Sequence, residues 1–480
     1  MNISVILEMA TSAGDRPAVT AGGQSLTAVE LLDLARVAAR RFQRYPAVLY
    51  LGANHLAYPV ALFGAALAGI PLVPINYRLG ESQLTGIVAR HPGALVLRPD
   101  DLDALLQPPP EDGAPNPAPA VTPDQDGVAL LIYTSGTTAE PKAAVLRHRH
   151  LLAYVWNTCE FFSAEDGDAA LVAAPPYHIA GLTNLLSNLY TGRRVVYLAA
   201  FDAGEWLDTV RRERITHAMV VPTMLARIVA EVPGNSDPGT PTLRSLAYGG
   251  ARTPRPVLER ALRTFPGVDF VNAYGLTETA SSVAVLGPED HRTAAAASVP
   301  GARDRLGSVG RALPGIEIQI RGGGGEPLGM GETGLVFVRG EQISGEYGGR
   351  SGLDADGWFA TRDLGRLDAD GYLFIEGRAD DTIIRGGENI APAEIEDVLL
   401  AYPGVVEAAV VGLSDPDWGQ RLVAVLVGDG DPAEIQRWVR DRLRSSKTPD
   451  TIVFRTELPK TETGKLLRRA ILAELETTHA

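Results

Sequence analysis

Short apolar runs alternate with longer helical patterns over the first 280 residues, and this alternation limits the fold more than any other sequence feature. The apolar runs end in small or polar residues and lie at 47–52, 94–98, 128–134, 169–175, 194–198, 217–222, 245–250 and 269–275. The clearest helical patterns lie at 26–45, 204–215 and 255–265. Strands that alternate with helices form layers of parallel sheet and helix. We therefore predict a large N-terminal α/β domain built on parallel sheets.

The texture changes near residue 309, where strand patterns punctuated by glycine follow one another at 315–328, 333–340 and 357–378. Consecutive strands with turns between them indicate an antiparallel β subdomain. Beyond Arg378 a second α/β pattern begins, with helices expected at 393–403 and 433–444 and strands at 405–413 and 421–428. We predict two domains, 1–379 and 380–480, of which the second is a small, mobile α+β domain.

Composition excludes several classes of function. The chain has 44 Lys and Arg against 58 Asp and Glu, a net charge of −14, which disfavours a nucleic-acid partner. The single cysteine, Cys159, forms neither an internal disulfide nor a zinc site. The longest apolar region, 49–75, is interrupted by Asn54, Pro59 and Pro71, so stable membrane insertion is not expected. No secretory signal is recognised at the N-terminus, and we expect a cytoplasmic location.

A loop at 132–142, IYTSGTTAEPK, follows one of the buried strands. Its backbone N–H groups, four Thr and Ser hydroxyls and one lysine suit a polyphosphate. The loop is not a Walker A sequence, and a plain hairpin turn has a similar composition. This loop alone leaves both interpretations open.

Five motifs in order together resemble one family. They are TSGTTAEPK (134–142), AYGLTET (273–279), TRD (361–363), GRADDTIIRGGENIAPAEIE (377–396) and LPKTETGKLLRR (458–469). From about residue 15 to the end, the chain resembles the acyl-adenylate-forming enzymes, and in motif texture most of all their acyl- and aryl-CoA ligases. The resemblance implies that ATP and Mg²⁺ convert a carboxylate to acyl-AMP and pyrophosphate, and that CoA then displaces AMP.

The resemblance assigns most of the site. Thr134, Ser135, Gly136, Thr137, Thr138 and Lys142 would hold the phosphates, while Gly249, Gly250, Ala251, Asn272 and Tyr274 would surround adenine. Thr277 would touch the nucleotide phosphate, and Glu278 would bind Mg²⁺, which prefers carboxylate oxygens. Asp363 and Arg378 would bind the ribose, Asp380 would be the hinge, and Lys465 would stabilise the charge that develops during adenylation.

This sequence departs from the family pattern at three positions. Ala139, Ala143 and Arg362 stand where the family commonly has glycine. An alanine at 139 or 143 is strained if its position requires a positive φ. The departure at Arg362 leaves the neighbouring Asp363 in place.

The resemblance also locates the acid pocket. Its candidate residues are Trp156, His178, Ile179, Val221, Thr223, Ala247, Ala273, Leu276 and Ser281. No cation is among them, so a dicarboxylate would leave a buried charge unpaired. An apolar monocarboxylate, aryl or medium-chain, remains. His178 either gates the pocket and contacts the carboxylate or is a core histidine beside Tyr177.

CoA is the predicted acceptor, and Gly386, Gly387 and Trp418 are the candidates for its pantetheine tunnel. Arg442, Arg444 and Lys447 either attract the CoA 3′-phosphate or form an ordinary charged helix face. Two alternatives stay open: transfer to a carrier protein or a nitrogen nucleophile, and an ATP-binding regulator without turnover, suggested by Ala139 and Ala143. A homodimer is compatible with the sequence, which says nothing of oligomeric state.

Overall fold

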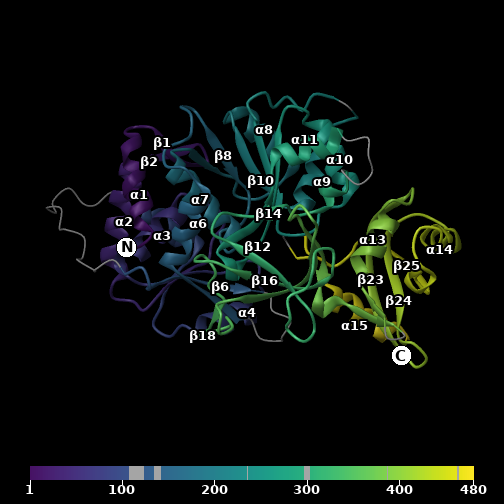
Figure 1. The fold of residues 1–480 in the computed structure, drawn as a ribbon. Coiled ribbons are helices and arrows are strands. Elements are labelled where there is room, and N and C mark those ends of the chain that lie inside the picture. The colour runs from purple at the N-terminus through teal and green to yellow at the C-terminus, as the bar shows by residue number, and fades with distance from the viewer. Residues whose placement is uncertain are drawn as a thin grey trace, which may run out of the picture.

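The computed structural model describes residues 1–107, 124–134, 142–234, 236–296, 303–385, 388–461 and 464–479. They form a large lobe that holds the N-terminus and a smaller lobe that holds the C-terminus (Figure 1). Parallel sheets, antiparallel strands and a small C-terminal α/β unit are all present, which confirms the predicted fold class.

Within the described residues, nine strands form the largest sheet. Their order across the sheet is β14 (Arg311–Ala312), β13 (Ser281–Leu286), β12 (Asp269–Leu276), β11 (Ser245–Gly249), β10 (His217–Val220), β8 (Ala169–Val172), β9 (Arg194–Tyr197), β1 (Pro17–Ala21) and β2 (Gln24–Thr27). The strands from β12 to β1 run parallel, and antiparallel strands close both edges.

A second sheet of the large lobe combines a parallel part with an antiparallel edge. Its strands, in order, are β5 (Leu95–Leu97), β3 (Val48–Tyr50), β4 (Leu72–Pro74), β6 (Val128–Thr134), β7 (Lys142–Arg147), β17 (Glu346–Tyr347) and β18 (Arg350–Ser351). The antiparallel subdomain predicted after residue 309 is present as β15 (Glu317–Arg321), β16 (Gly334–Arg339), β19 (Phe359–Leu367) and β20 (Leu373–Arg378).

Helices fill the space between the two large sheets and cover their outer faces. The inner helices are α1 (Ser4–Ala10), α2 (Ala28–Phe42), α3 (Ala57–Ala68), α6 (His148–Thr158) and α7 (Ile179–Thr191). The outer helices are α8 (Ala203–Arg212), α9 (Pro222–Glu231), α10 (Arg255–Thr264) and α11 (Pro288–Ala296) on the first sheet, α4 (Glu81–Ala89) on the second, and the short α5 (Pro99–Leu102) near β5.

The inner helices show why these segments fold as they do. Helix α2 begins with a capping box, because Thr27 Oγ1 accepts the Glu30 N–H and the Glu30 carboxylate accepts the Thr27 N–H. Helix α3 is apolar on every side, which suits burial among other helices. Gly64 lets α3 approach α2, since a Cβ there would lie 2.9 Å from Ala38 Cβ.

The small lobe is built on the sheet β23 (Val405–Asp415), β24 (Gly419–Gly428) and β25 (Thr451–Arg455). Helices α13 (Pro392–Leu400) and α14 (Pro432–Arg440) cover one face, and α15 (Arg468–His479) covers the other. A short pair, β21 (Ile383–Arg385) and β22 (Glu388–Ile390), joins it to the large lobe.

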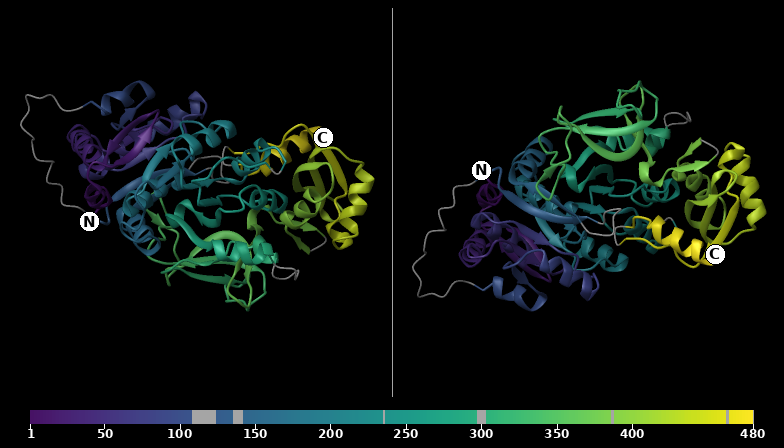
Figure 2. Two further views of the ribbon diagram at one scale, coloured as in Figure 1. Left: turned by 90° about the horizontal axis from the view of Figure 1, so that it is seen from above. Right: turned by 90° about the horizontal axis from the view of Figure 1, so that it is seen from below.

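The small lobe lies against one end of the large lobe in each view of Figure 2. The parallel strands β8 to β12 share one carboxyl edge, where ligands bind in open α/β sheets. None of the helices in the described ranges is both long and apolar enough to cross a membrane.

Candidate active site

Strands β6 and β7 bring together the two ends of the predicted phosphate loop. Thr134, the last residue of β6, pairs with Lys142, the first of β7, and the Thr134 hydroxyl donates to the Lys142 carbonyl over 3.5 Å. Ala143 pairs with Tyr133 in the same ladder and is not in the left-handed region, so this alanine is unstrained. Ser135, Gly136, Thr137, Thr138 and Ala139 lie outside the described residues.

Close packing of β11 against β12 forms the wall predicted for adenine. A Cβ at Gly249 would lie 2.2 Å from the Ala273 carbonyl oxygen, so only glycine fits. Gly250 follows with φ +83°, a conformation that favours glycine, and Ala251 continues the loop. The structure thus leaves a backbone surface free of side chains at this strand end.

Asn272 and Tyr274 lie on β12 beside this wall, and both side chains already have partners. The Asn272 amide donates to the Ser308 carbonyl over 3.1 Å, a contact that the sequence did not indicate. The Tyr274 hydroxyl donates to Asp363 Oδ2 over 2.5 Å. Burial, and then the Asp363 charge, raises the pKa of Tyr274 well above its usual value, so this hydroxyl stays protonated as a donor.

Asp363 lies at the centre of a buried charge cluster. It is only 4% exposed, and the register of β19 and β20 places it opposite Arg378, whose Nη1 donates to Asp363 Oδ1 over 2.9 Å. Burial alone would lower the pKa of Arg378, but the Asp363 carboxylate raises it overall. The pair holds the carboxylate in one orientation at the site.

Arg362, directly before Asp363, adopts a left-handed backbone with φ +63°. This is the position where the family commonly has glycine. A non-glycine residue is strained in this region of φ. The departure noticed in the sequence is therefore a point of backbone strain next to a predicted ligand-binding carboxylate.

Thr277 and Glu278 open a short 3₁₀ turn after β12, Thr277–Thr279. Two residues in the left-handed region, Ala280 with φ +51° and Ser281 with φ +122°, follow it. Glu278 is 8% exposed, and burial raises the pKa of its carboxyl group. Strain of this kind gathers at functional sites.

The donor set fits a magnesium ion held mainly by its ligand. Among the described residues, Glu278 has no ion-pair partner within 4 Å, and no group of three or more acidic, histidine or cysteine residues gathers to hold a metal. Mg²⁺ commonly uses one or two carboxylates together with substrate phosphates and water. A single buried carboxylate near β7, the strand that follows the predicted phosphate loop, meets that requirement.

The small lobe brings Lys465 to the same place. Gly464 has φ +78°, and a Cβ there would lie 2.3 Å from Thr223 Cγ2 of the large lobe. Lys465 keeps more than a third of its surface exposed, yet desolvation, and then nearby Arg378, lowers the pKa of its ammonium group. Lys465 and Asp363 are near enough to interact electrostatically.

Further contacts tie the lobes together around the predicted hinge. Arg252, in the loop after the adenine wall, forms an ion pair with Asp397 on α13. Asp380 lies in the turn Ala379–Asp381 between β20 and β21. Arg468 on α15 lies 3.6 Å from Asp381 and also binds the buried Glu396, so α15 is anchored beside that turn.

The predicted acid-pocket residues come from the first sheet, from the starts of α7 and α9, and from α6. Ala247 pairs with Met219 and Val271 on the adjacent strands, and both Ala247 and Ala273 are only half-buried. His178 directly precedes α7 without a side-chain capping hydrogen bond, and its ring lies 4.7 Å from that of Tyr177. Burial lowers the pKa of His178 to about 4, so its imidazole is neutral near pH 7.

The other candidates for the acid pocket differ in how they are placed. Trp156 is 44% exposed on α6, whereas Val221 is 7% exposed. The Ser281 hydroxyl accepts a hydrogen bond from Thr183 over 3.1 Å. Ile179, Thr223 and Leu276 are half-buried.

The structure adds a cleft that the sequence did not indicate. It has a volume of about 150 Å³ and borders Thr223; its other lining residues include Asn54, Tyr77, Arg78, Phe201 and Arg227. The Asn54 amide donates to the carbonyls of Ala174 and Leu198 and so holds together the ends of β8 and β9. These residues come from segments without a recognised motif, so no local signal could have identified them.

The candidates for CoA binding are mostly occupied or exposed. Trp418 is 55% exposed in the turn between β23 and β24, with the Arg385 guanidinium 5.4 Å from its ring. Gly386 and Gly387 lie outside the described residues. The predicted 3′-phosphate cations already have partners: Arg444 pairs with Glu388 over 2.7 Å, Lys447 pairs with Glu394, and Arg442 stacks on Trp438.

Known proteins with similar sequences match nearly the whole of this chain. A family model for AMP-binding enzymes matches residues 7–347, and one for the AMP-binding enzyme C-terminal domain matches residues 394–465. The chain is 37% identical to a feruloyl-CoA synthase from Amycolatopsis sp, covering 94% of each sequence. It is 34% identical to the fatty acid–[acyl-carrier-protein] ligase ScoC from Streptomyces coeruleorubidus, covering 95% of this chain and 92% of that protein.

Among solved structures, the chain resembles an o-succinylbenzoate CoA synthetase from Bacillus subtilis in complex with its acyl-adenylate intermediate. The two are 28% identical, with a TM-score of 0.83 and 97% of each chain covered. The same synthetase has also been solved with ATP and a magnesium ion.

Proposed function

The chain belongs to the AMP-binding enzyme family and is an AMP-forming acid–thiol ligase that uses ATP, Mg²⁺ and CoA; we propose that its acid is an apolar monocarboxylate, with an aryl acid favoured. The half-buried sheet face with Ala247 and Ala273 supports an apolar acid, because small apolar side chains leave room without offering a charge. The 37% identical relative named for feruloyl-CoA supports an aryl acid.

One observation carries the proposal: four charged groups from both lobes converge at one place. Glu278 follows β12, Asp363 and Arg378 face each other on β19 and β20, and Lys465 comes from the small lobe. An adenylation must bring a carboxylate and a triphosphate together, so it needs cations at the reacting oxygens. If these charges served only to stabilise the fold, an exposed lysine would not be needed among them. Lys465 is nevertheless held there, because the preceding Gly464 packs against Thr223 of the large lobe.

In this proposal each residue has a separate task. Lys142 and the hydroxyls of the phosphate loop orient the leaving pyrophosphate, and Thr277 binds the α-phosphate. Glu278 holds Mg²⁺, which when bound neutralises phosphate charge. Asp363 accepts hydrogen bonds from the ribose, and Lys465 stabilises the charge that develops at the α-phosphate.

The remaining assignments concern the acid and the second half-reaction. A neutral His178 at the start of α7 suits contact with the bound carboxylate, since it can donate a hydrogen bond without a fixed charge. We propose that the chain divides into domains 1–379 and 380–480, with Asp380 as the hinge. Rotation of the small domain would bring the exposed Trp418 and the strand after Arg385 to the path along which the CoA thiol reaches the acyl-AMP.

The experiment is an assay of purified protein with ATP, Mg²⁺ and a panel of acids. The panel contains cinnamate, 4-hydroxycinnamate, octanoate, malonate and phenylalanine, each with CoA, with a phosphopantetheinylated carrier protein, or with no acceptor. We expect AMP release with aryl acids and acyl-CoA by mass spectrometry. Preference for malonate or phenylalanine would contradict the apolar pocket.

A second acceptor has a specific observation in its favour. The relative ScoC is named as a ligase for an acyl-carrier protein, and the exposed Trp418 is accessible to a macromolecule. Acyl transfer to the carrier protein at a higher kcat/KM than to CoA would establish this alternative in place of CoA.

A further inference from the structure

Helix α7 buries polar side chains that its packing alone does not require. Thr183, Asn188 and Thr191 are each at most 6% exposed. The neighbouring Asn184 brings its amide nitrogen to 3.7 Å from the sulfur of Met219 on β10. Buried polar groups are costly unless they are hydrogen-bonded, so the partners of this row bear on what α7 does.

A chain of hydrogen bonds fixes the orientation of two asparagines. Arginine has only donors, so Arg193 Nη1, 2.7 Å from Asn188 Oδ1, requires that atom to be the oxygen. The Asn188 Nδ2 therefore faces Asn184 and donates to both its carbonyl and its Oδ1, each over 2.7 Å. Asn184 must then direct its own Nδ2 away from Asn188, toward Met219. A thioether is a weak acceptor, which leaves this donor poorly satisfied.

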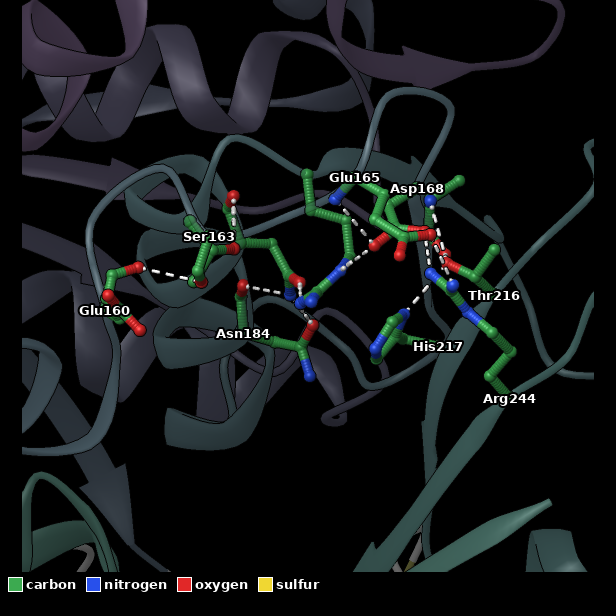
Figure 3. Close-up of polar contacts among 12 residues, drawn as sticks. Glu160, Ser163, Glu165, Asp168, Asn184, Thr216, His217 and Arg244 are labelled. Carbon is green, nitrogen blue, oxygen red and sulfur yellow. Dashed lines mark hydrogen bonds and ion pairs between the residues drawn. The ribbon is translucent and has the colours of Figure 1, made fainter.

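The Arg193 guanidinium, at the start of this series of hydrogen bonds, is held in place and has a nearby carboxylate that offsets its charge. Arg193 is 18% exposed, and its Nε lies 3.9 Å from Asp168 Oδ2. Asp168 is 6% exposed and also binds Arg244 (Figure 3). Because Asp168 offsets the charge of Arg193, the cation sets the direction of the amides and does not provide an anion site.

The Asn184 amide borders the sheet face proposed for the acid. On β10 to β12 the residues of this face, His217, Met219, Ala247, Val271 and Ala273, are half-buried, whereas the alternate residues Ala218, Val220, Leu246, Tyr248 and Phe270 are buried. An alanine in a central strand stays half-buried only where no side chain covers it. Figure 3 shows Asn184 and His217 within the same group of polar residues.

The group that meets this amide must be neutral. Burial lowers the pKa of His217 to about 4, so its ring carries no charge near pH 7. A carboxylate here would be buried without a free counter-charge. A purely alkyl terminus would leave the amide donor unsatisfied, which is also unfavourable.

We propose that Asn184 is a specificity-determining residue that donates a hydrogen bond to a neutral oxygen, a hydroxyl or methoxy group, at the end of an aryl acid remote from its carboxylate. This inference rests on the proposed function, because it places the acid along the face of β10 to β12. Asn188 and Arg193 are positioning residues that keep the donor directed toward the acid.

The test compares kcat/KM for acyl-AMP formation with cinnamate, 4-hydroxycinnamate and 4-methoxycinnamate. The wild-type chain should prefer both substituted acids by about tenfold, the scale of one neutral hydrogen bond. Asn184→Leu should abolish the preference, so that the three acids give similar kcat/KM values. Asn157→Leu, the same change on α6 away from the chain of hydrogen bonds, should leave the preference intact.

Asn184→Asp tests the direction of the hydrogen bond. Aspartate keeps the shape but can only accept, so this variant should still use 4-hydroxycinnamate, which can donate, and should lose the preference for 4-methoxycinnamate. Arg193→Met should weaken the preference for both, because Asn188 is then free to reverse its amide. Variants are compared only as ratios between acids, which a general loss of folded protein does not change.

Three results would overturn the inference. Equal kcat/KM for the three acids in the wild type contradicts it while leaving an aryl substrate in place. A preference that survives in Asn184→Leu contradicts the role of this residue. Activity confined to octanoate contradicts both this inference and the aryl substrate of the proposed function, so the two failures are distinguishable.

Discussion

Replacing Lys465 by alanine should abolish most of the adenylation and leave thiolation largely intact. Lys465 keeps more than a third of its surface exposed, so an effective dielectric constant of about 20 is appropriate rather than that of a dry interior. At about 4 Å from a negative oxygen, a unit charge then contributes about 4 kcal/mol. Loss of one such preorganised group corresponds to about a 10²- to 10³-fold decrease in kcat.

The assay for Lys465→Ala separates the half-reactions. Adenylation is followed by ATP–pyrophosphate exchange with the preferred acid, and thiolation is followed as acyl-CoA formed from supplied acyl-AMP. Lys460→Ala is the matched control, because Lys460 lies five residues earlier and its ammonium is paired with Glu407. This control should exchange pyrophosphate at the parental rate.

The pH dependence gives a second readout. Desolvation lowers the pKa of Lys465 below 10.5, and only the protonated form stabilises the developing negative charge. The exchange rate of the wild-type chain should therefore fall as the pH rises through this lowered pKa, and Lys465→Ala should lack that limb. Near-parental exchange by Lys465→Ala would refute the assignment, and equal loss of both half-reactions would indicate misfolding.

Other residues give independent tests. Gly464→Ala should reduce adenylation at least tenfold, because its Cβ would clash with Thr223 and the φ of +78° disfavours alanine. Adding Thr223→Ala should partly restore the rate in the double variant. An unchanged rate in Gly464→Ala would refute the contact. Arg362→Gly should raise the free energy of unfolding by up to about 1 kcal/mol, because glycine adopts the φ of +63° without strain. Urea denaturation measures this change, and a loss of stability would show that no strain is stored at this position. Burial lowers the pKa of His148 from 6.5 to about 4, so the unfolded chain binds more protons than the folded one between these pH values. The free energy of unfolding should therefore fall as the pH falls from about 6.5 to 4. His148→Gln should flatten this dependence, and an unchanged slope would contradict the burial argument.

The sequence by itself determined the fold class and the chemical types at the site. Parallel strands must be apolar along their length, so the runs at 128–134 and 245–250 identify β6 and β11 without reference to the rest of the chain. Glu278, Asp363 and Lys465 were singled out because they lie in motifs that resemble those of the acyl-adenylate-forming enzymes. The motif order then predicted that they belong to one site.

Tertiary structure alone decided which side chains meet. The hairpin of β1 and β2 has no sequence pattern strong enough to predict it, since its strands are short and gain stability from pairing with β9. Thr223 and Gly464 are 241 positions apart, and only the docking of the lobes brings them into contact.

The site proposed for the acid shows the same division between local and long-range information. The sequence offered no cation among the candidate lining residues. Arg193, however, lies two hydrogen bonds from Asn184 and sets the direction of its amide. Asn184, Asn188 and Arg193 lie within ten residues of one another, but the Asp168 and Met219 side chains at the two ends of the series come from other segments. Periodicity and composition describe one element at a time. They therefore identify the residue types in this series of contacts but not which group donates each hydrogen bond.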